Sequence, residues 1–131
     1  MPRFQNILGE FTPSELCYLL YAYHEVGYVP KPFAAEVEAL VKRRLLETEE
    51  ITPQELSLIV RVFCNTRSAS RDFHRLLETC ILMRLNDLKN DRNIMYQIGY
   101  NFESTGLCSL DTLKAFKKVY FQSEVEQEVF N

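Results

Sequence analysis

Apolar residues along the chain recur at intervals of three and four positions, the spacing that places them on one face of an α-helix. Glycine and proline are few, and long stretches contain neither, which favours helices over a turn-rich β-fold. The pattern predicts six helices. Four of them span about 13–26, 32–47, 53–65 and 71–88, a fifth contains residues 95–102, and the sixth begins near Ser109.

Two of these helices begin with the same signature. Thr12-Pro13-Ser14-Glu15 and Thr52-Pro53-Gln54-Glu55 each place a threonine before a proline and a glutamate three positions after the threonine. In such a capping box the threonine oxygen accepts a backbone N–H of the first turn, and the glutamate accepts the threonine N–H. Proline suits the first helical position because the N–H it lacks would have no partner there. At the start of the fifth helix, Asn90 or Asp91 replaces the threonine.

The chain also matches itself. When residues 11–50 are laid over 51–90 without a gap, the identical positions are Thr12, Pro13, Glu15, Leu16, Phe33, Glu38, Arg44 and Leu45. Self-similarity at a fixed period predicts stacked repeats, because each repeat has an apolar face that it can bury only against its neighbours. We therefore predict an all-α, right-handed α-solenoid of about three antiparallel helix-hairpin repeats. It forms a single domain with repeats over about 11–50, 51–90 and 91–122 and an acidic C-terminal tail over 123–131.

Length, charge and cysteine spacing narrow the class of protein. The 131 residues fit one domain, and the formal net charge of -3 counts against a dedicated nucleic-acid binder. No two of the four cysteines form a C-x-x-C motif, so we expect buried thiols in a reducing compartment. No apolar run approaches the length of a membrane span, so we expect a soluble chain without membrane insertion. The first residues show neither a secretory signal nor a transit segment, so any organellar address is removed or atypical.

The first helix, Glu15-Leu16-Cys17-Tyr18-Leu19-Leu20-Tyr21-Ala22-Tyr23, follows a Thr-Pro-x-Glu-Leu opening and precedes a glycine and a second helix that begins at Phe33. This arrangement resembles the helical repeats of octotricopeptide, heptatricopeptide and FAST-kinase-like proteins, which act in organellar RNA metabolism. The resemblance covers about residues 11–122. It implies a mitochondrial location and a role beside RNA, although the chain has few repeats, no RAP domain and an acidic balance.

Basic residues are the candidate contacts of such a protein. Three interpretations of these residues remain open: they complement helix dipoles on a solvated surface, contact RNA phosphates, or bind an acidic partner protein. For RNA, Tyr18, Tyr21, Tyr28 or Tyr96 would stack on bases, although packing between repeats is the favoured role of Tyr18 and Tyr21. The candidate basic contacts are Lys42, Arg43, Arg61, Arg67, Arg71, Arg75, Lys114, Lys117 and Lys118.

Catalytic chemistry has little support in the sequence. His24 and His74 are the only histidines, neither has a carboxylate placed to form a metal pair or a catalytic dyad, and no phosphate-binding or nucleophile motif occurs. We therefore expect no enzyme activity, catalytic residue, metal, cofactor or small-molecule substrate.

The predicted function is a scaffold or adaptor subunit of a larger mitochondrial assembly, in RNA processing or in the ribosome, with other protein subunits as its partners. The alternatives are direct single-stranded RNA binding and a structural accessory subunit of a respiratory-chain or ATP synthase complex.

Overall fold

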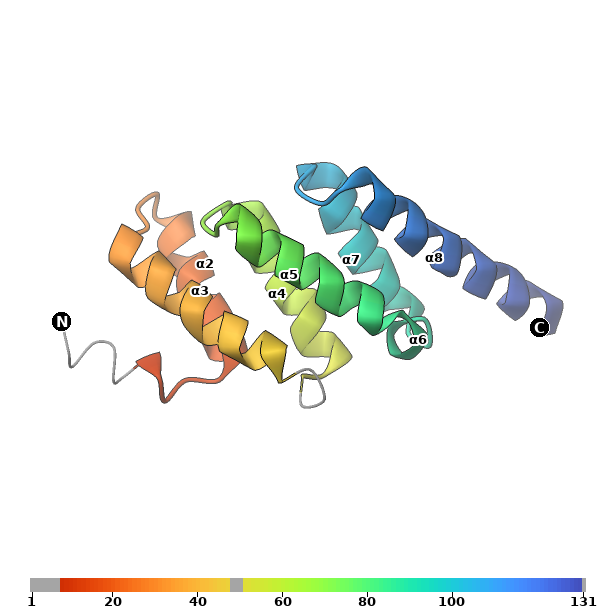
Figure 1. Cartoon of the computed structure of the whole chain (residues 1–131), viewed down its shortest axis with the longest axis horizontal. Helices are drawn as coiled ribbons and strands as arrows, with labels where there is room; N and C mark the ends of the chain where they lie inside the picture. The colour runs from red at the N-terminus through yellow and green to blue at the C-terminus, as the bar shows by residue number, and fades with distance from the viewer. Residues whose placement is uncertain (1–7, 48–50, 131) are drawn as a thin grey trace.

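The computed structural model describes residues 8–47 and 51–130, with side chains described up to Gln122 (Figure 1). This part of the chain is all-helical and contains no strand, which confirms the prediction that the fold is all-α. Its helices are α2 (Pro13–Glu25), α3 (Lys31–Leu46), α4 (Pro53–Thr66), α5 (Arg71–Met83), α6 (Leu85–Leu88), α7 (Arg92–Thr105) and α8 (Leu110–Phe130).

The predicted helix starts are confirmed by their hydrogen bonds. Thr12 Oγ1 accepts the Glu15 N–H at 3.2 Å, and Glu15 Oε1 accepts the Thr12 N–H at 2.9 Å. Thr52 and Glu55 repeat this pair of bonds at 3.1 and 3.4 Å. At α7 the cap is Asp91, whose carboxylate accepts two backbone N–H groups of the first turn at 3.0 and 3.1 Å. A local sequence signature therefore sets where three of the helices begin.

The helices form three successive pairs, α2 with α3, α4 with α5, and α7 with α8. A residue in the left-handed region of backbone conformation follows the first helix of each pair. Gly27 has φ 84°, Arg67 has φ 52° and Gly106 has φ 66°. They succeed one another at intervals of 40 and 39 residues, which is the period of the sequence match. Glycine adopts this conformation easily, whereas a residue with a Cβ is strained in it. Arg67 is therefore an exception that the sequence pattern did not predict.

The helix predicted over 71–88 is interrupted at Arg84, so this prediction was wrong. The backbone there has φ -109° and ψ 14°, and the Arg84 N–H bonds to the Ile81 carbonyl, three residues back. The Arg84 guanidinium donates to the carbonyl of Ile51, in the connection that precedes α4. The break was missed because Leu85 and Leu88 continue the apolar spacing beyond it, and both lie against the core.

The helices form two layers (Figure 1). In one layer α2 packs on α4 and α4 on α7, and in the other α3 packs on α5 and α5 on α8. The helices α3, α5 and α8 run in the same direction across the front of Figure 1. The core lies between the layers, where the Phe63 ring of α4 meets the Phe73 ring of α5 with centroids 4.5 Å apart.

Helix α8 is the longest helix and continues to Phe130. The segment predicted as an acidic tail therefore begins as part of this helix, while the side chains from Ser123 onward lie outside the described set. Within the described residues, no helix has both the length and the apolar composition that crossing a bilayer requires.

Candidate functional site

Four of the predicted basic contacts are exposed on two neighbouring helices of one layer. Arg71 and Arg75 are exposed on α5, and Lys114 and Lys118 are exposed on the neighbouring α8. Acidic residues lie on the same two helices, because Asp72 and Asp111 are also exposed in their first turns. This surface therefore carries mixed charge.

The other basic residues lie on different helices or are engaged in contacts. Lys42 and Arg43 are exposed near the end of α3, and Arg61 is exposed on α4, in the other layer. The Arg67 guanidinium donates to the Thr105 carbonyl at 2.8 Å, so it fastens the end of α4 to the end of α7. Lys117 forms an ion pair with Glu103 at 2.9 Å.

The two predicted aromatic contacts differ in their surroundings. Tyr21 packs partly against the core, and its hydroxyl lies close to Glu25 and Arg61. Hydrogen bonding to the Glu25 carboxylate is the main reason that the pKa of Tyr21 is raised. Tyr18 is 63% exposed, so the favoured role of packing between repeats was wrong for this residue.

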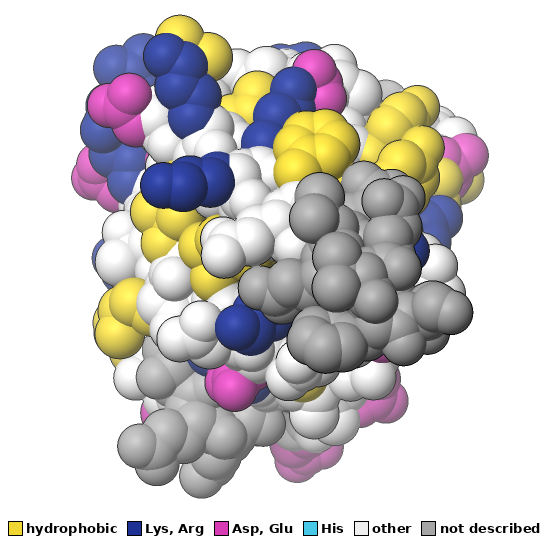
Figure 2. All heavy atoms as spheres, turned by 90° about the vertical axis from the view of Figure 1, so that its right-hand side faces the viewer, with side chains coloured by type: hydrophobic (Ala, Val, Ile, Leu, Met, Phe, Trp, Pro, Cys, Tyr) yellow, Lys and Arg dark blue, Asp and Glu magenta, His cyan; other side chains and the backbone are white. Residues whose placement is uncertain are grey.

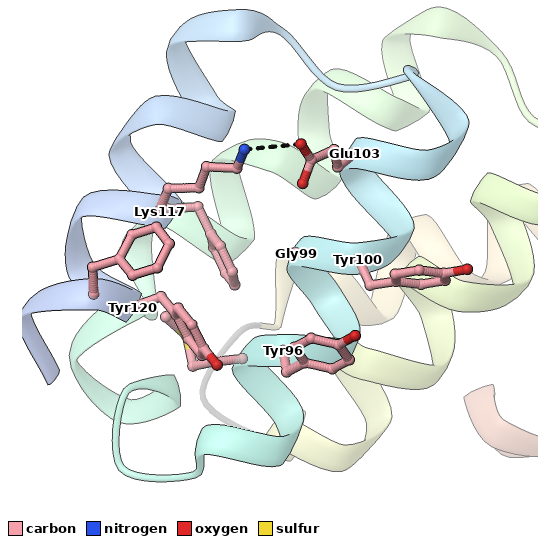
Figure 3. Close-up of a pocket in the computed structure, with 9 residues that line it drawn as sticks. Tyr96, Gly99, Tyr100, Glu103, Lys117 and Tyr120 are labelled. Atoms are coloured by element: carbon pink, nitrogen blue, oxygen red, sulfur yellow. Dashed lines mark hydrogen bonds and ion pairs between the residues drawn. The ribbon is translucent and has the colours of Figure 1, made fainter. Parts of the chain in front are cut away.

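A groove with a volume of about 230 Å³ lies between α7 and α8. We call it the end groove, because it lies at the end of both layers (Figure 3). Figure 2 looks onto this end and shows apolar side chains interrupted by lysine and arginine. The residues that line the groove are Met95, Tyr96, Gly99, Tyr100, Glu103, Phe116, Lys117, Tyr120 and Phe121.

Aromatic rings and one ion pair shape the end groove. Tyr96 and Tyr100 project from α7 with their rings stacked at a centroid distance of 6.2 Å (Figure 3). The Lys117–Glu103 ion pair joins α8 to α7 at one side of the groove. Gly99 allows the two helices to approach closely, because a Cβ there would lie 3.0 Å from Phe116 Cε1.

The end groove includes one position that is buried in the other two helix pairs. Cys17 of α2, Ser57 of α4 and Tyr96 of α7 are equivalent by the intervals of 40 and 39 residues. Their exposed fractions are 0%, 6% and 60%, respectively. Each of the first two residues is buried on a helix that has a following helix of the same layer packed on it, whereas in the described chain no helix follows α7 in its layer.

A repeated hydrogen bond joins successive helix pairs in the second layer, which contains α3, α5 and α8. Glu38 of α3 accepts the N–H of Ser70, the cap of α5, at 2.9 Å. Glu78 of α5 accepts the N–H of Ser109, the residue before α8, at 2.5 Å. The equivalent position on α8 is Lys117, which is not an acceptor. The carboxylate that receives the next helix pair is therefore replaced in the last pair.

Tyr100, Tyr120 and Phe121 line the end groove but were not predicted as contacts. Tyr100 lies four positions after Tyr96, so both share one side of α7 and diverge from the buried stripe of Met95, Ile98 and Phe102. Their position away from the buried stripe was the sequence feature from which Tyr100 could have been predicted as a contact. The sequence alone could not show that this side of α7 stays uncovered.

The cysteines and histidines of the described chain do not form a reactive site. All four thiols are free, and burial raises the pKa of Cys17 to about 12 and the pKa values of Cys64 and Cys108 to about 11. Such thiols are protonated at neutral pH and are weak nucleophiles. Burial also lowers the pKa of His74, and no group of three His, Cys, Asp or Glu side chains among the described residues is arranged to hold a metal ion.

Comparison with protein-family models, curated proteins and solved structures finds no match to this chain. The end groove and the contacts that repeat along the two layers are therefore the features of the chain that bear on its function.

Proposed function

We propose that the chain is a right-handed α-solenoid of three helix-hairpin repeats that acts as a non-enzymatic scaffold or adaptor subunit. The observation that carries this proposal is the end groove, where Tyr96 is exposed at a position that the other two helix pairs bury and other exposed aromatic residues lie beside it. Clustered exposed apolar side chains are typical of protein-binding surfaces, and tyrosine is enriched in such interfaces. The groove is therefore the docking site for a protein partner.

Several repeated contacts support the solenoid interpretation. The capping boxes, the left-handed residues and the Glu38 and Glu78 contacts all recur at the period of the sequence match. In a solenoid, each repeat contacts its neighbours, and an end repeat has one side without a neighbour. An uncovered surface of this kind can receive another protein without any rearrangement of the fold.

The biological setting is part of the same proposal. The resemblance of the Thr-Pro-x-Glu-Leu repeats to organellar helical repeats favours a mitochondrial assembly in RNA processing or in the ribosome. The chain contributes a docking surface to that assembly and performs no chemistry of its own.

Affinity purification of the tagged full chain from mitochondria tests the proposal. We expect a defined set of proteins to be captured at about 0.15 M salt and to persist after ribonuclease treatment, because apolar contacts resist salt whereas phosphate contacts weaken steeply. Tyr96→Glu combined with Tyr100→Glu places two charges in the groove and should remove these proteins. Met83→Glu, at another exposed apolar residue, is the matched control and should retain them.

Two results would contradict the proposal. Capture that is unchanged in the groove variant would show that the partner binds elsewhere. Capture that disappears with ribonuclease would favour direct RNA binding, and the variant Arg75→Glu with Lys114→Glu would then test the basic residues that α5 and α8 share.

A further inference from the structure

The opposite end of the molecule also exposes an apolar stripe. Tyr18, Ala22 and Val26 follow one another at intervals of four residues along α2 and its cap, so they lie on one side of the helix. Tyr18 is 63% exposed and Val26 is 77% exposed. We call these three residues the start stripe.

The equivalent residues of α7 contact the preceding helix of their layer. Gln97, which corresponds to Tyr18, accepts the Ser57 hydroxyl of α4 at 3.3 Å. Asn101, which corresponds to Ala22, accepts the Asn65 amide of α4 at 2.9 Å. The start stripe therefore lies on the side of α2 that would face a preceding helix.

We propose that the end groove binds the start stripe of a second copy of this chain, so that copies associate head to tail and both layers continue across the junction. The inference rests on the proposed function, in which the groove is a protein-docking site, and it names the partner. By the repeat intervals, Tyr96 of one copy would meet Tyr18 of the next. Such aromatic pairs contribute to an interface beyond the area that they bury.

The caps of the second layer favour this partner over a helix pair of another kind. Within the chain, Ser70 and Ser109 each bring an N–H that Glu38 or Glu78 accepts. The equivalent cap of the first pair is Pro30, which has no N–H. A helix pair that begins with Pro30 therefore brings no cap amide that needs an acceptor, whereas one that begins with serine would bring an N–H to a position where Lys117 offers no carboxylate.

Charge along the second layer is complementary as well. At a head-to-tail junction, α3 of the next copy would lie beside α8 and run in the same direction, as α5 does within the chain (Figure 1). Exposed Lys42 and Arg43 lie near the C-terminal end of α3. The sequence places glutamates at 124, 126 and 128, in the last third of α8. Opposite charges thus fall at the same end of the two helices, which favours this orientation.

A contact between two different surfaces does not close on itself unless its rotation completes a ring. The junction therefore predicts chains of copies whose length grows with protein concentration. A groove-to-groove pairing of two copies would instead stop at a dimer.

Sedimentation of the purified full chain tests this inference, with Tyr100→Glu to block the groove and Tyr18→Glu to block the start stripe. At concentrations up to about 100 μM, which covers the micromolar affinity of weak interfaces, the unmodified chain and the Met83→Glu control should form species larger than a monomer. Each blocked variant alone should stay monomeric. An equimolar mixture of the two should form a 1:1 dimer and nothing larger, because each variant keeps one functional end.

Other results overturn the inference. A monomeric unmodified chain over this range would exclude the second copy, and a dimer of Tyr18→Glu alone would indicate groove-to-groove pairing. In either case, groove-dependent capture of other mitochondrial proteins would leave the proposed function standing. Circular dichroism checks that each variant is folded, and Val26→Glu and Tyr96→Glu block the same two surfaces at independent exposed positions.

Discussion

At the scale of single residues, Arg67 carries two opposing effects. Its backbone has φ 52°, a conformation that a residue with a Cβ adopts at a cost of about 1–2 kcal/mol. Its guanidinium donates to the Thr105 carbonyl at 2.8 Å, between the ends of α4 and α7. The hydrogen bond offsets part of the backbone strain, which explains how an arginine can occupy a position where the other two helix pairs have glycine.

Substitution of Arg67 separates the two effects. Arg67→Ala removes the hydrogen bond and keeps the strain, whereas Arg67→Gly removes both. We expect the free energy of unfolding of Arg67→Gly to exceed that of Arg67→Ala by about 1 kcal/mol. The stability of Arg67→Gly should be close to that of the unmodified chain. Urea unfolding of the three proteins measures the difference. Equal stability of the two variants would show that the conformation is not strained.

At the scale of helices, the Glu78 carboxylate determines how α8 is attached. Glu78 is buried on α5 and accepts the Ser109 N–H, while the Ser109 hydroxyl accepts the Thr112 N–H at 3.2 Å. The start of α8 is thus held to its neighbour and capped through one residue. Loss of the acceptor would leave a partly buried amide without a partner.

We expect Glu78→Ala to destabilise the fold by about 1–3 kcal/mol and Glu78→Gln by less, because the glutamine oxygen can still accept the amide. Urea unfolding gives the stability, and hydrogen exchange at the Ser109 amide reports the contact itself. Glu36→Ala, on α3, controls for the loss of one carboxylate. Unchanged exchange at Ser109 in Glu78→Ala would contradict the assignment.

Helix starts were predictable because a capping box is a local signature, and Thr12, Thr52 and Asp91 all form the expected bonds. The break at Arg84 was not predictable from apolar spacing, because Leu85 and Leu88 continue that spacing through it. The end groove depends on which side of α7 remains uncovered once the layers pack. That property arises only in the tertiary structure, so the sequence indicated Tyr96 and Lys117 as candidates and missed Tyr100, Tyr120 and Phe121 on the same surface.

At the scale of the whole molecule, buried or half-buried thiols are distributed through all three helix pairs. Cys17 lies in the first pair, Cys64 and Cys80 in the second, and Cys108 beside the third. Burial raises the pKa of Cys17 to about 12 and that of Cys64 to about 11, from an ordinary value of 9.0. The fold therefore disfavours the thiolate throughout its length.

These thiols predict alkaline instability. A group whose pKa is higher in the folded chain than in the unfolded chain makes its full contribution to the stability of the fold below the unfolded pKa. It loses that contribution as the pH rises towards the folded pKa. The free energy of unfolding should therefore fall above pH 9, by up to about 1.4 kcal/mol per pH unit for each thiol that is ionised only when unfolded. Urea unfolding at pH 7 to 11 measures the slope. Cys17→Ala should flatten it, and an identical slope in that variant would contradict the assignment.

The Glu38 and Glu78 contacts also fix the order in which the three helix pairs can follow one another along the chain. An extra copy of the middle helix pair, inserted after residue 90, would keep every cap amide matched to a carboxylate and lengthen the molecule. An extra copy of the last pair would set the lysine at 117 against a serine amide and end the match. Duplication of the middle helix pair therefore preserves the contacts between pairs, whereas duplication of the last helix pair does not.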